Sequence, residues 1–430
     1  MSDLETRAVP ARAPLLRRAV PALLGYAAVR ALGLAVLAGW SAARGKSAHT
    51  LLTARWDSLW YTRVAELGYG YEVRLPNGDV HSNLAFFPLL PWLERLLHAL
   101  APLSYADAGF VVSLSASLAA AAGIFAVADR LYGPRTGFFA VLLWAVLPVG
   151  IVQSMAYSES LFTALAAWSL YAVLAGRWVS AGVLAALAGL TRPVGAAVVA
   201  AVWTAAVISF VRERGTRHAP GAHPATRAPG GHAPGAPALG AHGPGGDASG
   251  APAVTPVGPT GPGAPAWRRA LGMLLAPLGA AGYVLWVGHR TGAGPLGYLD
   301  VQAGWRNGFD GGYAFARFVA GRFTSFPSAL AGLGLIAGVA LLIWLYVICV
   351  RRRQPPALLV YTGVVLALAL CASSYFGSKP RLLMPAFPLL LPLACALARR
   401  RPPVAALVTA GLAGVAAVYG AFWLNGSGPP

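Results

Sequence analysis

Apolar segments of about 17–25 residues recur along this chain of 430 residues, separated by short polar stretches. That length matches the hydrocarbon core of a bilayer, about 30 Å thick. The alternating pattern of barrel strands is not evident in the sequence, and a helical bundle is then the remaining way to pair backbone groups in lipid. The pattern predicts an all-α polytopic membrane protein with about eleven transmembrane helices, near residues 19–41, 108–128, 136–152, 160–176, 179–191, 194–211, 269–289, 326–350, 356–373, 382–398 and 403–424.

One apolar stretch, 179–211, is too long for a single span and short for two. The sequence Thr191-Arg192-Pro193 interrupts it in the middle. We therefore expect two short helices that meet at the outer face of the membrane. An arginine at that depth is costly in lipid and normally faces protein or a water-filled cavity.

The positions of the charged residues along the chain indicate its orientation in the membrane. Hydrophobic residues make up 57% of the chain and charged residues 11%, yet the net charge is +19. The arginines cluster at the ends of the apolar segments, which indicates cytoplasmic flanks under the positive-inside rule and a cytoplasmic N-terminus, with no nucleic-acid partner. These clusters are Arg12, Arg17 and Arg18, then Arg212, Arg214 and Arg217, then Arg268 and Arg269, then 351–353 and 399–401. The three cysteines lie in or beside apolar segments, so neither a disulfide framework nor a metal site is predicted, and no cleavable signal peptide is expected.

These features divide the chain into four parts. A basic cytoplasmic segment, 1–18, precedes an N-terminal transmembrane module, 19–211, whose first extracytoplasmic loop is 42–107. A cytoplasmic linker, 212–268, is dominated over 215–266 by Gly, Pro, Ala and His and is predicted to be disordered. The C-terminal module, 269–424, contains an outer loop, 290–325. Four irregularly spaced linker histidines favour a passive tether over a metal site: His218, His223, His232 and His242.

The outer side of this topology gathers the polar positions that could carry chemistry. Its four loops are 42–107, 153–160, 290–325 and 373–381, and Arg192 joins them from the broken pair of helices. The first loop begins with a charged, aromatic-rich segment, 54–72, predicted to form a helix lying in the membrane interface. Helical spacing places Asp57, Tyr61 and Val64 on one side and Trp56, Leu59, Trp60 and Arg63 on another. The segment is either an interfacial anchor with Asp57 as a cap or salt-bridge partner, or part of a site.

Other candidates have two interpretations as well. Residues 83–91 are either a re-entrant helix that grips a lipid tail or a packing element of the outer loop. Tyr157 and Glu159 begin a span, where Glu159 either compensates the helix dipole or faces a cavity. Lys379, Arg381 and Arg192 are cations at membrane depth that either bind a lipid phosphate or snorkel to headgroups; these three are conspicuous because they are predicted on the outer side. No nucleotide-binding signature is present, so an activated donor would be lipid-borne.

Five segments together resemble the GPI mannosyltransferase II (PIG-V-like) family and its bacterial relatives, within the GT-C superfamily of membrane glycosyltransferases. They are RWDSLWYTRVAELGY (55–69), NLAFFPLLPWLERLL (83–97), AYSESLF (156–162), GLTRPVG (189–195) and, more loosely, SKPRLLMPAFPLL (378–390). The resemblance covers residues 20–210 well and the C-terminal half weakly. The linker has no counterpart in the family.

The resemblance implies a GT-C-like bundle and an inverting transfer of mannose from a polyprenyl-phosphate carrier at the outer face. Asp57 is similar in position to the acidic residue of the first outer loop, which would act as base. Arg55, Glu159, Arg192, Lys379 and Arg381 would contact the donor phosphate or substrate, with Trp56, Trp60 and Tyr157 around them. Many GT-C enzymes have an adjacent acidic pair here, whereas position 58 is Ser, which leaves a divalent metal unsupported. The rival hypotheses are a transporter or lipid flippase and a non-catalytic GT-C-like subunit; the acceptor stays open.

Overall fold

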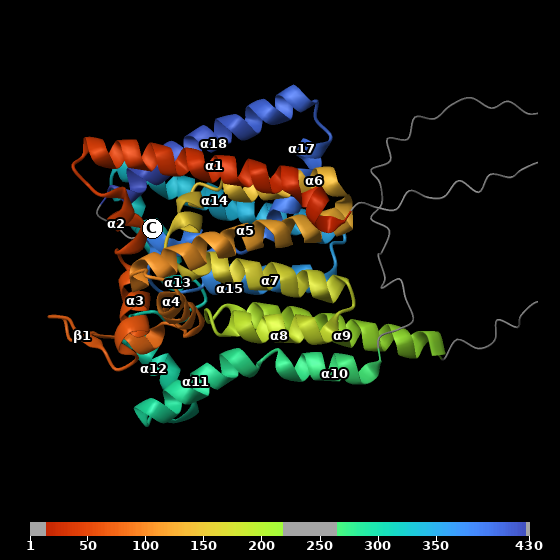
Figure 1. Cartoon of the computed structure of the whole chain (residues 1–430), viewed down its shortest axis with the longest axis horizontal. Helices are drawn as coiled ribbons and strands as arrows, with labels where there is room; N and C mark the ends of the chain where they lie inside the picture. The colour runs from red at the N-terminus through yellow and green to blue at the C-terminus, as the bar shows by residue number, and fades with distance from the viewer. Residues whose placement is uncertain (1–13, 218–264, 427–430) are drawn as a thin grey trace, which may run out of the picture.

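The computed structural model of the protein describes residues 14–217 and 265–426. Most helices run side by side along one axis, and short elements gather at one end of the bundle (Figure 1). The first half contains α1 (Leu15–Ala43), α2 (Ala48–Thr53), α3 (Asp57–Leu67), β1 (Glu72–Arg74), β2 (Val80–Ser82), η1 (Asn83–Ala85), α4 (Leu89–Leu100), α5 (Tyr105–Tyr132), α6 (Pro134–Ala145), η2 (Gly150–Ser154), α7 (Ser158–Leu174), α8 (Trp178–Gly189) and α9 (Gly195–Arg217).

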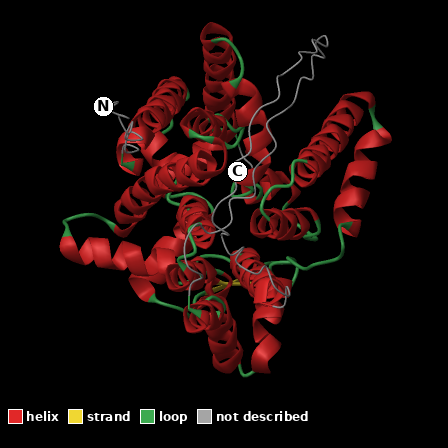
Figure 2. Ribbon diagram, turned by 90° about the vertical axis from the view of Figure 1, so that its right-hand side faces the viewer, coloured by secondary structure: helices red, strands yellow, loops and turns green. Residues whose placement is uncertain are grey.

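The second half continues the same bundle. It contains α10 (Ala266–Leu275), α11 (Leu278–Thr291), η3 (Gly294–Leu296), α12 (Gly297–Gly304), α13 (Tyr313–Ala320), η4 (Gly321–Thr324), α14 (Phe326–Arg351), α15 (Pro356–Leu370), η5 (Phe376–Ser378), α16 (Lys379–Leu382), η6 (Phe387–Leu390), α17 (Leu391–Ala398) and α18 (Pro402–Leu424). Seen from the end, many of these helices project along their axes, with the two short strands at the far end (Figure 2).

The structure corrects the predicted number of membrane spans. Each of the eleven expected segments contains helix, but among the described residues six segments are long and apolar enough to cross a membrane, or up to seven with one bent pair. The others are too short: α7, α8 and α15 have 10–17 residues, and α6 has 12. The segment predicted at 382–398 is broken, since 376–382 and 387–398 meet at 73°. The chain is a multi-pass membrane protein with fewer full-length spans than the hydropathy pattern predicts.

The interrupted stretch breaks where predicted, but only its first helix is short: α8 has 12 residues, whereas α9 contains one of the six segments long enough to cross a membrane. Helices α8 and α9 are separate and meet at Thr191-Arg192-Pro193, at the same end of the bundle as the short elements (Figure 1). The backbone N–H of Leu89 in α4 donates to the carbonyl of Leu190 at 3.0 Å, which ties this turn to the first loop. Arg192 is thereby held at the end of the bundle, within protein contacts.

The first loop folds over this end of the bundle. Helix α3 buries Tyr61 and Val64 and exposes Leu59, as its helical spacing predicts. The hairpin of β1 and β2 was not predicted; its antiparallel register pairs Glu72 with Ser82. Such a three-residue pairing is too short to give a clear alternating pattern in the sequence.

The opposite end of the bundle is the basic one. Arg18 of α1 forms an ion pair with Asp129 at 2.6 Å, and Arg135 donates to the carbonyl of Arg400 at 2.9 Å. The start of α1, the end of α9 and the start of α10 all lie at this end (Figure 1). Both ends of the predicted linker, 212–268, are helical: α9 continues to Arg217 and α10 begins at Ala266. The rest of it, with the four histidines, lies at 218–264, outside the described residues.

Candidate active site

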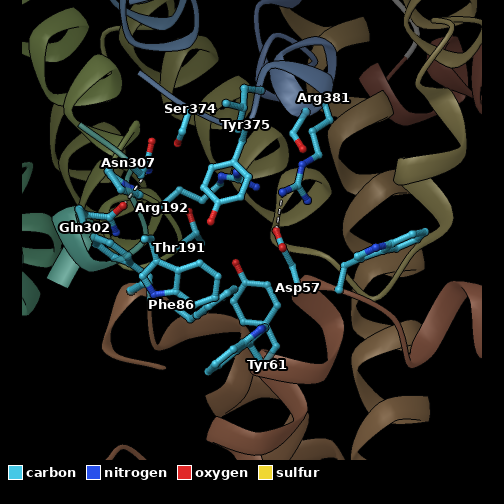
Figure 3. A pocket seen from close by; sticks show the side chains of 18 of the residues that line it. Asp57, Tyr61, Phe86, Thr191, Arg192, Gln302, Asn307, Ser374, Tyr375 and Arg381 are labelled. Atoms are coloured by element: carbon cyan, nitrogen blue, oxygen red, sulfur yellow. Dashed lines mark hydrogen bonds and ion pairs between the residues drawn. The ribbon is translucent and has the colours of Figure 1, made fainter. Parts of the chain in front are cut away.

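A cavity of about 290 Å³ lies at the end of the bundle opposite the basic clusters. Three of the four predicted outer loops line this cavity, together with the turn that contains Arg192. The remaining outer loop, 153–160, lies directly behind the cavity wall. The residues that line it are Trp56, Asp57, Trp60, Tyr61, Ala85, Phe86, Phe87, Thr191, Arg192, Pro193, Tyr298, Gln302, Trp305, Asn307, Ser374, Tyr375, Ser378, Arg381 and Leu382. Segments more than 300 residues apart in sequence therefore meet around one space (Figure 3).

A strained backbone turn positions Asp57 at the start of α3. Trp56, directly before the helix, has φ 51° and ψ −121°, a left-handed conformation that costs a non-glycine residue about 1–3 kcal/mol. The Ser58 hydroxyl donates to the Arg55 carbonyl at 2.6 Å and fixes this turn. Tyr375, on the facing wall of the cavity, also has a left-handed φ of 52°. Strain of this kind on both sides of one cavity is typical of functional sites.

Asp57 and Arg381 form the central ion pair of the site. The Arg381 Nη2 lies 2.7 Å from the Asp57 Oδ2 (Figure 3). The Asp57 side chain is 25% exposed and the Arg381 side chain 9%. Behind the pair, the ring of Tyr157 lies 5.0 Å from the guanidinium carbon. The backbone N–H of Asp57 donates to the Tyr157 hydroxyl at 3.4 Å, so one aromatic residue orients both partners.

Glu159 connects this pair to a second arginine. Its Oε1 lies 2.5 Å from the Arg192 Nη1 and 3.5 Å from the Arg381 Nη1. The Glu159 side chain is only 1% exposed, because α7 begins inside the bundle. Burial has the largest single effect and lowers the pKa of Arg192, but the Glu159 carboxylate and Tyr61 together raise it, so the net pKa of the guanidinium lies above its ordinary value. Two cations and two carboxylates thus alternate along the wall of the cavity and the layer directly behind it.

A short hydrogen-bonded chain supports Arg192. The Ser158 hydroxyl accepts from the Arg192 Nη1 at 3.3 Å and is paired with the Tyr61 hydroxyl at 2.7 Å. Tyr61 packs edge-on against Phe86, with ring centroids 5.1 Å apart. The arginine turn, α7 and α3 are therefore locked together by side chains from three of the motifs that resemble the mannosyltransferases.

The opposite wall is aromatic and carries amide groups. The ring of Trp305 lies 4.9 Å from that of Trp60, and its indole N–H donates to the Ser82 carbonyl at 3.0 Å. The Asn307 Nδ2 donates to the Gln302 Oε1 at 2.7 Å (Figure 3). These loop residues were not singled out from the sequence, although the loop 290–325 was predicted to face the same side.

The segment 83–91 makes the contacts of a packing element. The ring of Phe87 contacts that of Tyr283 at 4.4 Å, and Phe86 stacks on Trp60 at 5.6 Å. The Asn83 amide N–H donates to the Gly68 carbonyl at 3.0 Å. Within the described residues this segment joins the first loop to α11, which favours the packing interpretation over the lipid-gripping one.

Two predicted phosphate contacts lie outside the cavity. The Lys379 Nζ donates to the carbonyls of Ala369 and Ala372, each at 2.8 Å, and so caps the end of α15. Arg55 donates to the carbonyl of Leu424 at 3.1 Å and stacks on Trp56 at 3.8 Å. Both are occupied in holding helix ends. Of the other candidates, Trp56 and Trp60 line the cavity, whereas Tyr157 and Glu159 lie directly behind it.

Comparison with known proteins agrees with the motifs that meet here. Residues 83–224, which contain the segments of Phe86, Glu159 and Arg192, match the family of dolichyl-phosphate-mannose-protein mannosyltransferases. The chain is thus similar, over residues 83–224, to a family of mannosyltransferases. It is 32% identical over 149 residues to the GPI alpha-1,6-mannosyltransferase 2 of Rattus norvegicus, a match that spans 32% of this chain and 28% of the rat protein. The resemblance predicted from the motifs is confirmed.

Two solved structures are similar over larger parts of the chain. One is ArnT from Cupriavidus metallidurans bound to undecaprenyl phosphate, with a TM-score of 0.44 and 17% identity over 80% of this chain and 55% of ArnT. The other is the Archaeoglobus fulgidus oligosaccharyltransferase in complex with Zn and sulfate, with a TM-score of 0.40 and 13% identity over 91% of this chain and 53% of that protein. In the part of this chain that the structure describes, no group of three His, Cys, Asp or Glu side chains could hold a metal ion.

Proposed function

We propose that this protein is an integral membrane glycosyltransferase of GT-C type that transfers mannose, with inversion, from a polyprenyl-phosphate-mannose donor to an extracytoplasmic acceptor. The observation that carries the proposal is the cavity in which Asp57 faces the paired arginines Arg381 and Arg192. The relationship to mannosyltransferases supports the choice of sugar.

Asp57 acts as the general base. A sugar or protein hydroxyl is a weak nucleophile, and a carboxylate within hydrogen-bond reach accepts its proton as it attacks. The acceptor oxygen forms a bond to the anomeric carbon of mannose while the bond from that carbon to the phosphate oxygen breaks. The electron pair of the broken bond goes to the phosphate. Asp57 fits this role because its carboxylate is at the cavity surface and its backbone is held by a fixed turn.

Arg381 and Arg192 stabilise the leaving phosphate. Fixed cations aimed at developing negative charge are among the largest contributions to catalysis, and they cost no reorganisation during the reaction. A guanidinium presents donors in a planar fork that matches phosphate oxygens. Glu159 touches both arginines from behind and holds them in place, so it is a positioning residue in this proposal.

A second cavity suits the lipid part of the donor. It has a volume of about 350 Å³, is almost wholly apolar and lies between α14 and the segment 376–390. Lys379 and Pro380 face this cavity, whereas Ser378 and Arg381 face the polar one. A polyprenyl phosphate has the same division, with an apolar chain on one side of a charged group. We propose that the prenyl chain enters along α14 and presents its phosphate to Arg381.

The orientation in the membrane follows from the charges. The start of α1, the end of α9 and the start of α10, which carry basic clusters, lie at the end of the bundle opposite α3 (Figure 1), and α3 contributes residues to the polar cavity. Cytoplasmic flanks carry the excess of Lys and Arg. We therefore propose that the N-terminus is cytoplasmic and that the cavity opens on the extracytoplasmic side.

The test is transfer of labelled mannose from polyprenyl-phosphate-mannose by the purified protein in liposomes. We expect Asp57→Asn to lower transfer at least 100-fold, the usual range for loss of a general base. Asp79→Asn is the matched control, because Asp79 pairs with Arg306 at the same end of the bundle but does not line the cavity. Undiminished transfer by a well-folded Asp57→Asn protein refutes the base assignment. Movement of the intact donor across the bilayer without transfer would support the transporter hypothesis instead.

A further inference from the structure

We infer that Asp57 and the donor phosphate compete for the same guanidinium, so that phosphate binding to Arg381 releases Asp57 to act on the acceptor. This inference rests on the proposed function and adds an order of events: donor first, acceptor second. Its basis is the direct contact of 2.7 Å between the proposed base and the proposed phosphate ligand.

Arg381 has unused hydrogen-bonding capacity beside this contact. A guanidinium carries five N–H donors. The Nη2 binds Asp57, whereas Nε and Nη1 are buried and have no hydrogen-bond partner among the described residues, the Nη1 having only the 3.5 Å ion-pair approach to Glu159. Buried donors without partners are costly. A phosphate group offers several acceptor oxygens and satisfies such donors better than one carboxylate does.

The two carboxylates of the cluster are not equally easy to displace. Glu159 is 1% exposed and lies between two guanidinium groups. Asp57 is 25% exposed and has an ion pair with Arg381 alone among the described residues. The cluster holds two positive and two negative charges, so an added phosphate exceeds the available positive charge. Asp57 is therefore the group that gives way.

The exchange couples the two substrates. The Oδ2 of Asp57 is not available to the acceptor hydroxyl while it is bound to Arg381, and it becomes available when the phosphate takes over the guanidinium. After transfer, Asp57 carries the acceptor proton and Arg381 holds the product polyprenyl phosphate. When that product leaves, Arg381 pairs again with Asp57, which requires the carboxylate form, and the proton passes to water.

The experiment is to measure the dissociation constant of undecaprenyl phosphate for the purified protein in nanodiscs without acceptor. Competition predicts that Asp57→Asn, although impaired in transfer, binds undecaprenyl phosphate about tenfold more tightly than the wild type, a difference of about 1.4 kcal/mol. Arg381→Ala should bind it at least tenfold more weakly. Asp79→Asn again serves as the control for loss of a carboxylate at this end and should leave the affinity unchanged.

The outcomes separate the inference from the proposed function. If the wild type binds undecaprenyl phosphate and Asp57→Asn binds it equally or less tightly, the competition is wrong and the proposed donor stands. If the wild type does not bind it at all, the proposed donor class itself is wrong. Should Asp57→Asn fail to fold, Asp57→Ser removes the same charge with a smaller side chain and gives the same comparison.

Discussion

Glu159→Ala is the substitution that tests most strongly whether the arginines are held as a unit. The Glu159 carboxylate is 1% exposed and contacts Arg192 at 2.5 Å and Arg381 at 3.5 Å. Its removal leaves two guanidinium groups, 14% and 9% exposed, without their shared anion. Removing one partner of a buried ion pair destabilises a protein by about 3–5 kcal/mol. We expect a loss near the upper part of that range, because two cations lose one partner and then repel each other.

The assay is thermal unfolding of the purified protein in detergent, followed through tryptophan fluorescence. Glu159→Ala should lower the midpoint by several degrees, and transfer measured well below the midpoint should fall together with affinity for undecaprenyl phosphate. Glu66→Ala is the control, since Glu66 is exposed on α3, and such surface changes stay within about 0.5 kcal/mol. A midpoint for Glu159→Ala equal to that of the wild type would refute the positioning role.

Three further predictions concern packing, the lipid cavity and pH. Gly279→Ala should destabilise the protein by about 1–3 kcal/mol, because a Cβ there would collide with a main-chain carbonyl of α8, whereas Gly282→Ala on the same helix meets nothing within 4 Å; paired unfolding curves check both. Gly338→Phe should fill the apolar cavity beside α14 and weaken use of long-chain donors more than short-chain ones in the transfer assay, while Gly411→Phe on α18 should not. Burial raises the pKa of Glu94 well above its usual 4.5, so the folded protein holds a proton that the unfolded chain releases. Rising pH therefore favours the unfolded chain, and Glu94→Gln, which cannot ionise, should raise the unfolding midpoint at pH 8. The difference should vanish below about pH 4, where Glu94 is protonated in both states.

The sequence predicted which residues meet in the site better than it predicted the number of membrane spans. Asp57, Glu159, Arg192 and Arg381 were each placed at an outer helix end by hydropathy and charge, and the structure brings all four to one cluster. Hydropathy could not show where an apolar segment bends. The bend at 383–386 depends on packing against neighbouring helices. The hydropathy of one segment contains no information about that packing.

The roles of individual cations were harder to infer. Lys379 and Arg381 are two residues apart and looked equivalent, yet Lys379 caps α15 through two carbonyls and Arg381 meets Asp57. Which way each side chain points depends on the turn from η5 into α16, and sequence spacing does not define that turn. Gln302 and Asn307 were missed for a related reason, since amides in an irregular loop give no periodic signal.

The most direct test of the account is a structure of the protein bound to a non-transferable polyprenyl-phosphate-mannose analogue. The account predicts the phosphate within hydrogen-bond distance of Arg381 and Arg192, the prenyl chain beside α14, and the Asp57 carboxylate detached from Arg381 and facing the anomeric carbon. A phosphate bound at the basic end of the bundle, or an analogue in the cavity with the pair of Asp57 and Arg381 intact and remote from the phosphate, would contradict it.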